Sequence, residues 1–246
     1  MREMGESRLD VSQEHYENSS DTLREVTEQI TGLALPPETV GKWRAILGAV
    51  RIIDDRLDAI PEEKEREQFA SGVMNFLNGE VSSFSQDERL NNALGNVKDL
   101  VDGLSEVQRK SFLDSISRIL NITEKIKTEE ESSKFTTLTR LEGQVMGKVF
   151  IPFLPEEYRK SEKFPALLKV LTRLGRAANS FDTFIDLKED YRKGRARVRP
   201  TALNRLLLFG ATISDGMAFL KESKFSKNLI VHFTQRAKEV ILQTSE

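Results

Sequence analysis

Cysteine is absent from the 246 residues of this chain, and histidine is represented only by His15 and His232. Without thiols the protein can form no disulfide, thiolate metal site or cysteine nucleophile. With two imidazoles, neither a zinc site nor a Ser-His catalytic pair is expected. The lack of cysteine fits a reducing compartment, so we expect a cytoplasmic protein.

Long apolar runs are also missing, since no run approaches the roughly 18 residues needed to span a bilayer. The first ten residues, MREMGESRLD, are too polar for a signal peptide. Basic residues number 37 and acidic residues 39, so no binding to nucleic acid is expected. Hydrophobic residues make up 38% and charged residues 31%, which is typical of a globular chain rather than a disordered one.

Alternating strand patterns and Gly-rich phosphate loops are not visible, whereas helical periodicity runs through most of the chain. After Pro37, for example, Val40, Trp43, Leu47 and Val50 recur every three or four residues, which places Trp43 in the core. We therefore expect an all-α, single-domain bundle of about nine helices.

The helices are expected to follow one another with short connections. Residues 1–20 lack a clear apolar period and are expected to form a flexible N-terminal arm, followed by one domain over 21–246. The first helix would begin near Asp21 as cap, and Ser105 with Gln108 would form a capping box. Further helices are expected over residues 37–60, 62–78, 87–103, 105–127, 135–153, 165–192, 201–221 and 224–243.

Two of these helices carry aspartates at four-residue steps in apolar surroundings. The segment RIIDDRLD places Asp54 and Asp58 on one helix face, about 6 Å apart along the axis, with Asp55 beside them. The segment NSFDTFIDLKEDYRKG forms a second ladder with Asp182, Asp186 and Asp190. Such steps are common on solvated helix faces, but the apolar neighbours of both ladders and their joint occurrence favour a site.

The two ladders predict a magnesium site. Like charges at i,i+4 destabilise a helix by a few tenths of a kcal/mol per pair, so a cation would relieve them. Mg²⁺ prefers oxygen ligands and sits between carboxylates and substrate phosphates, and Mn²⁺ is the alternative ion. Five basic residues are expected to contact a bound diphosphate: Arg51, Arg140, Arg192, Lys193 and Arg195.

The order and spacing of these motifs resemble the squalene/phytoene synthase family of the all-α class I isoprenoid synthases. The likeness covers about residues 25–200. It comprises LALP ending at Pro36, Arg51 in the next helix, DDRLD, the small-residue segment GQVMG from Gly143 to Gly147, and DTFIDLKEDYRKGRARVRP. This sequence has Asp182 where the family has asparagine, and only 46 residues follow Pro200.

The resemblance implies that the aspartates hold Mg²⁺ against the diphosphate of farnesyl or geranylgeranyl diphosphate, and that metal and arginine promote its ionisation. Asp54, Asp58, Asp186 and Asp190 would serve catalysis, with Asp55 and Asp182 as further metal ligands. The resemblance also implies a central cavity among the helices, where Gly143 and Gly147 would allow the substrate chain to approach the backbone. Two prenyl diphosphates would then join head to head, and the sequence leaves a requirement for NADPH open.

Two other classes of function remain open. A terpene cyclase or a prenyl-diphosphate phosphatase could use the same scaffold. A non-catalytic helical interaction module would not need the five motif aspartates, which are Asp54, Asp55, Asp58, Asp186 and Asp190. The apolar run LLLF, Leu206 to Phe209, is expected to pack in the core, with membrane contact during product release as the alternative. His232 is expected to be structural, and the oligomeric state is not inferable.

Overall fold

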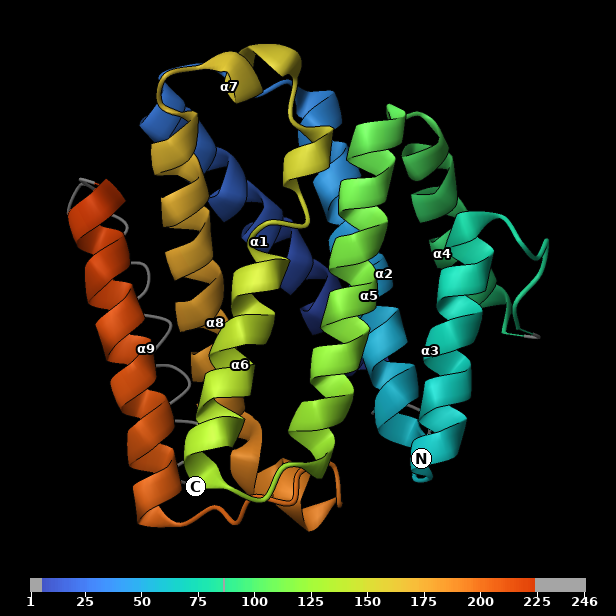
Figure 1. The fold of residues 1–246 in the computed structure, drawn as a ribbon, viewed down its shortest axis with the longest axis vertical. Coiled ribbons are helices and arrows are strands. Elements are labelled where there is room, and N and C mark those ends of the chain that lie inside the picture. The colour runs from blue at the N-terminus through green and yellow to red at the C-terminus, as the bar shows by residue number, and fades with distance from the viewer. Residues whose placement is uncertain (1–5, 86, 224–246) are drawn as a thin grey trace.

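The computed structural model describes residues 6–85 and 87–223, and this part of the chain forms one bundle of nine α-helices without a β-strand (Figure 1). The expected all-α class is therefore confirmed. In chain order the helices are α1 (Glu6–Thr31), α2 (Pro37–Ala59), α3 (Glu63–Asn78), α4 (Glu88–Asp102), α5 (Glu106–Thr128), α6 (Ser132–Met146), α7 (Glu156–Lys160), α8 (Phe164–Arg192) and α9 (Ala202–Ser223).

Two helix boundaries differ from the sequence prediction. Helix α1 begins at Glu6 rather than near Asp21, so the expected arm is helical over much of its length. The helix expected over 135–153 starts at Ser132 and ends at Met146, and a 3-10 turn follows at Ile151–Phe153. The expected helix over 224–243 and His232 lie outside the described residues.

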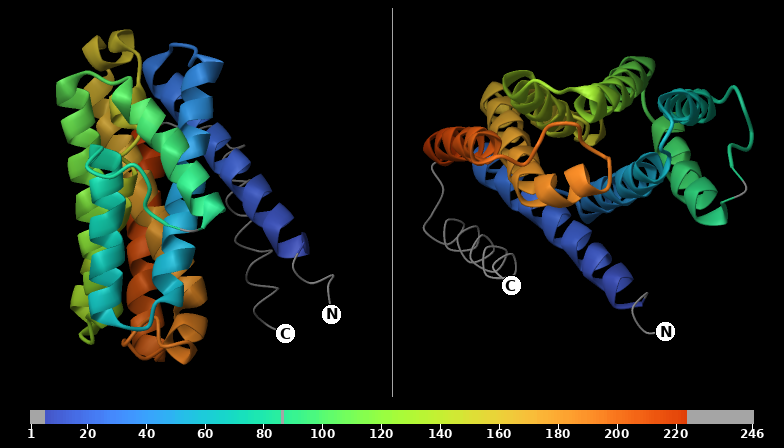
Figure 2. Two further views of the ribbon diagram at one scale, coloured as in Figure 1. Left: turned by 90° about the vertical axis from the view of Figure 1, so that its right-hand side faces the viewer. Right: turned by 90° about the horizontal axis from the view of Figure 1, so that it is seen from below.

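Most helices lie roughly along the long axis of the bundle, while α1 crosses one side of it obliquely (Figure 2). Trp43 of α2 is fully buried, as predicted, and its indole N–H donates to the Phe150 carbonyl over 3.2 Å. The two rings lie 5.8 Å apart between centroids. The capping box of Ser105 and Gln108 at the start of α5 is also confirmed.

Helices α6 and α8 pack with their backbones in close contact. A Cβ added to Gly143 would lie 2.2 Å from the Gly175 carbonyl oxygen, and one added to Gly147 would lie 2.2 Å from that of Leu171. Neither distance is possible for a real Cβ, so only glycine permits this approach. The result is that Glu142 on α6, next to Gly143, lies within hydrogen-bond distance of Asn179 on α8.

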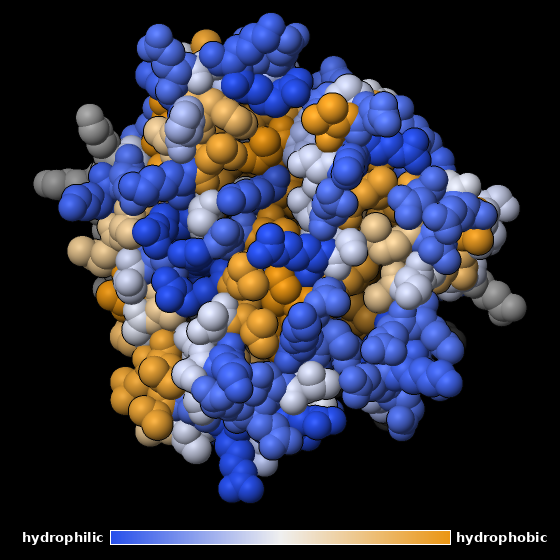
Figure 3. Space-filling view, in the orientation of Figure 1, coloured by the Kyte–Doolittle hydropathy of each residue, from blue (hydrophilic) through white to orange (hydrophobic). Residues whose placement is uncertain are grey.

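The outward side of α9 is apolar at its surface, and Figure 3 shows apolar side chains over this edge of the bundle. Of the LLLF run, Leu208 is buried as expected, whereas Leu206, Leu207 and Phe209 are 65%, 38% and 41% exposed, so the prediction of core packing is wrong for these three. Across residues 6–85 and 87–223, no helix has the length and apolarity to cross a membrane. The expected central cavity stays a prediction.

Candidate functional site

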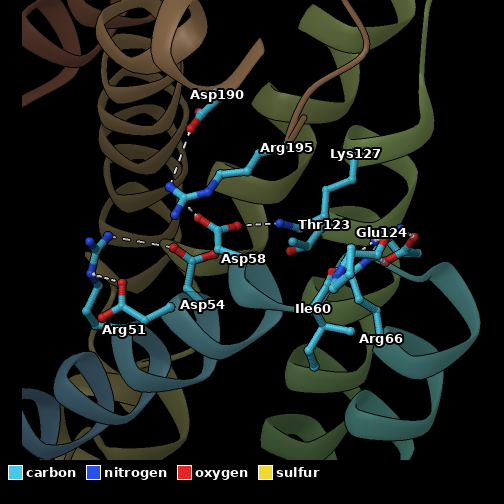
Figure 4. Close-up of polar contacts among 12 residues, drawn as sticks. Arg51, Asp54, Asp58, Ile60, Arg66, Thr123, Glu124, Lys127, Asp190 and Arg195 are labelled. Atoms are coloured by element: carbon cyan, nitrogen blue, oxygen red, sulfur yellow. Dashed lines mark hydrogen bonds and ion pairs between the residues drawn. The ribbon is translucent and has the colours of Figure 1, made fainter. Parts of the chain in front are cut away.

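The acidic ends of α2 and α8 meet at one end of the bundle. Asp58 lies in the last turn of α2 and Asp190 in the last turn of α8, and Arg195 follows α8 directly. Arg195 Nη1 lies 3.1 Å from Asp58 Oδ2 and 3.8 Å from Asp190 Oδ1. Figure 4 shows this guanidinium pointing between the two carboxylates. The two ladders, more than a hundred residues apart in sequence, are therefore neighbours in space.

The turn after α8 fixes the position of Arg195. Gly194 adopts a left-handed conformation with φ of 73°, which reverses the chain at the helix end. The Arg195 N–H then donates to the Asp190 carbonyl over 2.8 Å. Ala196 and Val198 are buried in a small core with Leu208 of α9, so the hydrogen bond to Asp190 and this packing together fix the turn.

Lys127, which the sequence analysis did not single out, supplies a second cation to Asp58. Its ammonium pairs with Asp58 Oδ1, while Arg195 pairs with Oδ2. Only 10% of the Lys127 side chain and 18% of the Asp58 side chain are exposed. A charge-assisted bond this shielded from water is stronger than a surface pair. Lys127 lies in the last turn of α5, where a basic residue is too common to signal a site.

Arg51 organises the start of the first ladder. Its Nε lies 3.0 Å from Asp55 Oδ1 and its Nη1 3.7 Å from Asp54 Oδ2. Burial and the charge of Glu189 raise the pKa of Asp186, and the positive charge of Arg51 offsets part of this rise. Arg51 on α2 therefore acts electrostatically on α8.

Glu142 of α6 is a further acidic residue of the site that the sequence analysis missed. Its carboxylate accepts hydrogen bonds from the Thr123 hydroxyl and from Asn179 Nδ2, the latter over 2.9 Å. Burial raises the pKa of Glu142. The two hydrogen bonds and the charge of Lys127 lower this pKa, but burial outweighs them, and the charge of Asp58 adds to the rise. The only sequence signal was a glutamate in the otherwise uncharged stretch LEGQVMG.

The carboxylates hold an excess of negative charge. Burial raises the pKa of Asp54 from 3.8 to about 7, and Asp58 and Glu142 raise it further against Lys127 and Arg51. Burial and the charge of Asp186 likewise raise the pKa of Asp190 to about 6. The Asp54 side chain is still 44% exposed, so water reaches this crowded carboxylate.

Three further predicted site residues are exposed on α8 and in the turn after it. Asp182 lies two turns before Asp190, about 12 Å away along the helix axis. Arg192 lies at the end of α8, and Lys193 pairs with Glu189, close enough to Asp186 for its charge to act on that carboxyl. The second ladder meets the first through Asp190, which Arg195 joins to Asp58.

Arg140, Gly143 and Gly147 have other partners than the aspartates. Arg140 pairs with Asp215 of α9 over 2.7 Å, so the structure does not bring it to either ladder. The space beside Gly143 and Gly147 is filled by the backbone of α8. Helix packing accounts for both glycines, and their contact with a substrate chain stays a prediction.

The donor set suits a hard divalent cation, because every acidic side chain here offers carboxylate oxygens. In the described part of the chain, however, no three acidic side chains are arranged around one position for a metal ion. Arg195 and Lys127 occupy the positions beside Asp58 instead. Mg²⁺ therefore fits the chemistry of these residues and would have to compete with protein cations.

Similarity to known proteins adds nothing to the assignment of this site. The residues and their geometry are thus the basis for its chemistry. No protein-family model, curated protein or solved structure matches the chain.

Proposed function

We propose that this protein is a Mg²⁺-dependent enzyme that ionises prenyl diphosphates and joins them head to head, in the manner of squalene/phytoene synthases. The observation that supports this most is the meeting of Asp58 and Asp190 at Arg195, which unites the two acidic motifs of the sequence. A diphosphate needs several positive charges at its oxygens, and this is where acidic metal ligands and basic side chains occur together.

The acidic side of the site would hold the metal. Asp54 and Asp58 from α2, with Asp186 and Asp190 from α8, are the proposed ligands. When bound there, Mg²⁺ supplies positive charge to the leaving diphosphate. The raised pKa values of Asp54 and Asp190 support this, because burial and then the neighbouring carboxylates disfavour their charged forms, and a bound cation would offset both effects.

The basic side of the site would bind the diphosphate directly. Arg195 and Lys127 bond carboxylate oxygens that resemble phosphate oxygens in charge, so they can exchange one for the other. Arg51 is 47% exposed and can donate to the same group from α2. These cations orient the diphosphate and stabilise the charge that develops on it as the allylic bond breaks.

A prenyl-diphosphate phosphatase is the second candidate, and the exposure of Asp54 favours it. Water that reaches Asp54 would capture an allylic cation and give an alcohol, whereas a coupling enzyme must keep water out. A terpene cyclase would make the same demand for exclusion of water. The three activities share the ionisation step and differ in the product.

The test is incubation of the purified chain with farnesyl or geranylgeranyl diphosphate. Mg²⁺ and NADPH are each supplied or omitted, and released diphosphate and extracted products are measured together. The Asp54→Asn/Asp186→Asn variant removes one carboxylate from each helix. Asp114→Asn, which alters an exposed carboxylate of α5, is the matched control.

The proposal expects Mg²⁺-dependent diphosphate release that falls by at least about a hundredfold in the double variant and not in the control. A C30 or C40 hydrocarbon identifies head-to-head coupling, and a C15 or C20 alcohol identifies the phosphatase. A cyclic hydrocarbon identifies a cyclase. Absence of release with either substrate, or release that ignores the double variant, contradicts all three.

A further inference from the structure

A second charged cluster lies on the face of the bundle formed by α6, α8 and α9, where Figure 3 shows strongly hydrophilic side chains between α9 and α6. Its centre is Asp215 of α9, whose side chain is fully buried. Arg140 Nε lies 2.7 Å from Asp215 Oδ2, and Arg173 Nη1 lies 2.8 Å from Oδ1. A third arginine, Arg176, is close enough for its charge to lower the pKa of Asp215.

The cluster has more positive charge than its carboxylates balance. Asp215 is the central acid for three arginines, and Glu222 is a second acid that contacts one of them, Arg173. Glu222 Oε1 lies 4.0 Å from Arg173 Nε but 2.9 Å from the Lys169 ammonium, so it neutralises Lys169 first. These six residues together therefore hold two positive charges in excess.

Arg176 is the arginine of the cluster whose hydrogen bond goes to a residue other than Asp215. Asp215 already has a guanidinium on each carboxylate oxygen, from Arg140 and Arg173. Arg176 instead donates from Nη2 to the Gln144 side chain, and its buried Nε has no hydrogen-bond partner. Burial lowers the pKa of Arg176, and the charges of Arg140 and Arg173 oppose its charge further despite Asp215. A buried donor without a partner costs about 1–3 kcal/mol, so it calls for an explanation.

We propose that Arg140, Arg173 and Arg176 form a binding site for a phosphate-class oxyanion on the α6–α8–α9 face, separate from the aspartate site. A phosphate dianion would match the excess charge and accept from several guanidinium N–H groups at once. Arg140 and Arg173 are 35% and 29% exposed, so a ligand can reach them from solvent. Asp215 fixes the two arginines in place before the anion arrives.

This site goes beyond the proposed function and does not depend on it. Arg173 and Arg176 come from the middle of α8 and Arg140 comes from α6, whereas the acidic ladder occupies the end of α8. Phosphate binding here needs no Mg²⁺ and uses none of the aspartates of the two ladders. The Asp54→Asn/Asp186→Asn variant is therefore expected to bind phosphate at this site as the parent chain does.

The experiment measures thermal unfolding and calorimetric titration of the full chain with inorganic phosphate and with diphosphate, without Mg²⁺ and at constant ionic strength set with chloride. Arg176→Gln is the main variant, because it leaves both pairs to Asp215 in place. Arg118→Gln removes an exposed arginine of α5 and is the matched control. Arg140→Lys retains the charge beside Asp215 but loses the planar donor fork.

Arg176→Gln is expected to change stability and anion affinity in opposite directions. Without anion, Arg176→Gln is expected to unfold at the same or a higher temperature than the parent, because it removes a half-buried charge that two arginines repel. With anion, its affinity is expected to fall by about tenfold, the loss of one charge-assisted bond. Arg140→Lys is expected to weaken binding as well, and Arg118→Gln is expected to leave it unchanged.

Co-sedimentation with phosphatidylcholine vesicles, with and without phosphatidic acid, distinguishes a phosphate headgroup from a free phosphate. Binding to either source that Arg176→Gln weakens supports the site. A lower unfolding temperature of Arg176→Gln without anion, together with unchanged binding, would show that Arg176 is a structural residue and overturn the proposal. No binding to any of these probes overturns it too.

Discussion

Arg195 reaches from the turn after α8 to Asp58 on α2, where its Nη1 lies 3.1 Å from Oδ2. With Lys127 on the other oxygen of Asp58, a protein cation stands on each side of this carboxylate. The same arginine lies 3.8 Å from Asp190. The two acidic helices are thus held together by positive charge of the protein, and a metal ion must compete for these oxygens.

Removal of this competitor should change metal and diphosphate binding in opposite directions. In Arg195→Gln, we expect Mg²⁺ alone to bind about tenfold more tightly, because a positive charge beside its ligands is gone. Inorganic diphosphate in the presence of Mg²⁺ should bind about tenfold more weakly, because one of its donors is gone. Calorimetric titration of each variant measures both affinities.

The control for this change is Arg197→Gln, in the same turn of the chain. Arg197 is 56% exposed and lies 3.8 Å from Glu130, away from the aspartates. The variant has the same net charge as Arg195→Gln and should match the parent in both titrations. Equal or weaker Mg²⁺ binding in Arg195→Gln would refute competition between the arginine and the ion.

Asp54 should make the folded state less stable as the pH rises. Its pKa in the fold is about 7, against 3.8 as the ordinary value, so the unfolded chain ionises first. The folded state therefore loses stability between about pH 4 and pH 7, and the loss is complete above pH 7. The 44% exposure of Asp54 limits the size of this effect through solvent screening.

Asp54→Asn removes this penalty. We expect the variant to unfold at a higher temperature than the parent at pH 8, and the difference should shrink toward pH 4. Thermal unfolding followed by circular dichroism across this range measures it, with Asp114→Asn as the exposed control. A difference that stays constant with pH would mean that Asp54 is ionised throughout the range.

The two ladders and most helix boundaries could be predicted from the sequence because they depend on local spacing. Four-residue steps place Asp54 and Asp58 on one face wherever the helix packs. Pro37 begins α2 and the Ser105 cap precedes α5, and both signals depend only on residues close by in the sequence. The polar composition of residues 1–20 hid the early start of α1, since apolar period is a weak signal in a helix end.

The partners of these residues could not be predicted, because they come from helices far apart in sequence. Lys127 meets Asp58 across 69 positions, and Arg140 meets Asp215 across 75. From the sequence, Arg140 and Arg195 were both expected to contact a bound diphosphate. The packing of α6 between α5, α8 and α9 decided that Glu142, not Arg140, faces the aspartates.

Arg66 should be a major source of stability next to the site. Its guanidinium binds both oxygens of Glu124 on α5, at 2.7 and 2.6 Å, and donates to the Ile60 and Pro61 carbonyls after α2. Arg66 is 9% exposed, and the hydrogen bonds that it donates to Glu124 raise its pKa. Arg66→Gln would leave Glu124 without its partner, so we expect a loss of about 3 kcal/mol in the free energy of unfolding.

Urea unfolding measures this loss against Arg56→Gln as control. Arg56 pairs with Asp87 but is 51% exposed, so its replacement should cost at most about 1 kcal/mol. The double variant Arg66→Met/Glu124→Met removes both charges and should regain much of the stability lost in Arg66→Gln. Equal costs for the two single variants would contradict a special role for Arg66.

The contact between α6 and α8 should tolerate no side chain at Gly143. A Cβ there would lie 2.2 Å from the Gly175 carbonyl oxygen and 2.8 Å from the Cβ of Asn179, so the two helices must separate. We expect Gly143→Ala to cost about 1–3 kcal/mol in the free energy of unfolding, measured by urea titration. Gly95→Ala on α4 is the control, because nothing lies within 4 Å of an added Cβ there and alanine should stabilise that helix by about 0.5–1 kcal/mol.

Separation of the helices should also disturb the site, because Glu142 is the neighbour of Gly143. Asn179 on α8 donates to Glu142 over 2.9 Å and to the Thr139 carbonyl over 2.8 Å, and both bonds must lengthen when α8 moves away. Gly143→Ala is therefore expected to reduce diphosphate release below that of Gly95→Ala at a temperature where both variants are folded. Full activity in a destabilised Gly143→Ala chain would show that Glu142 and Asn179 support the fold alone.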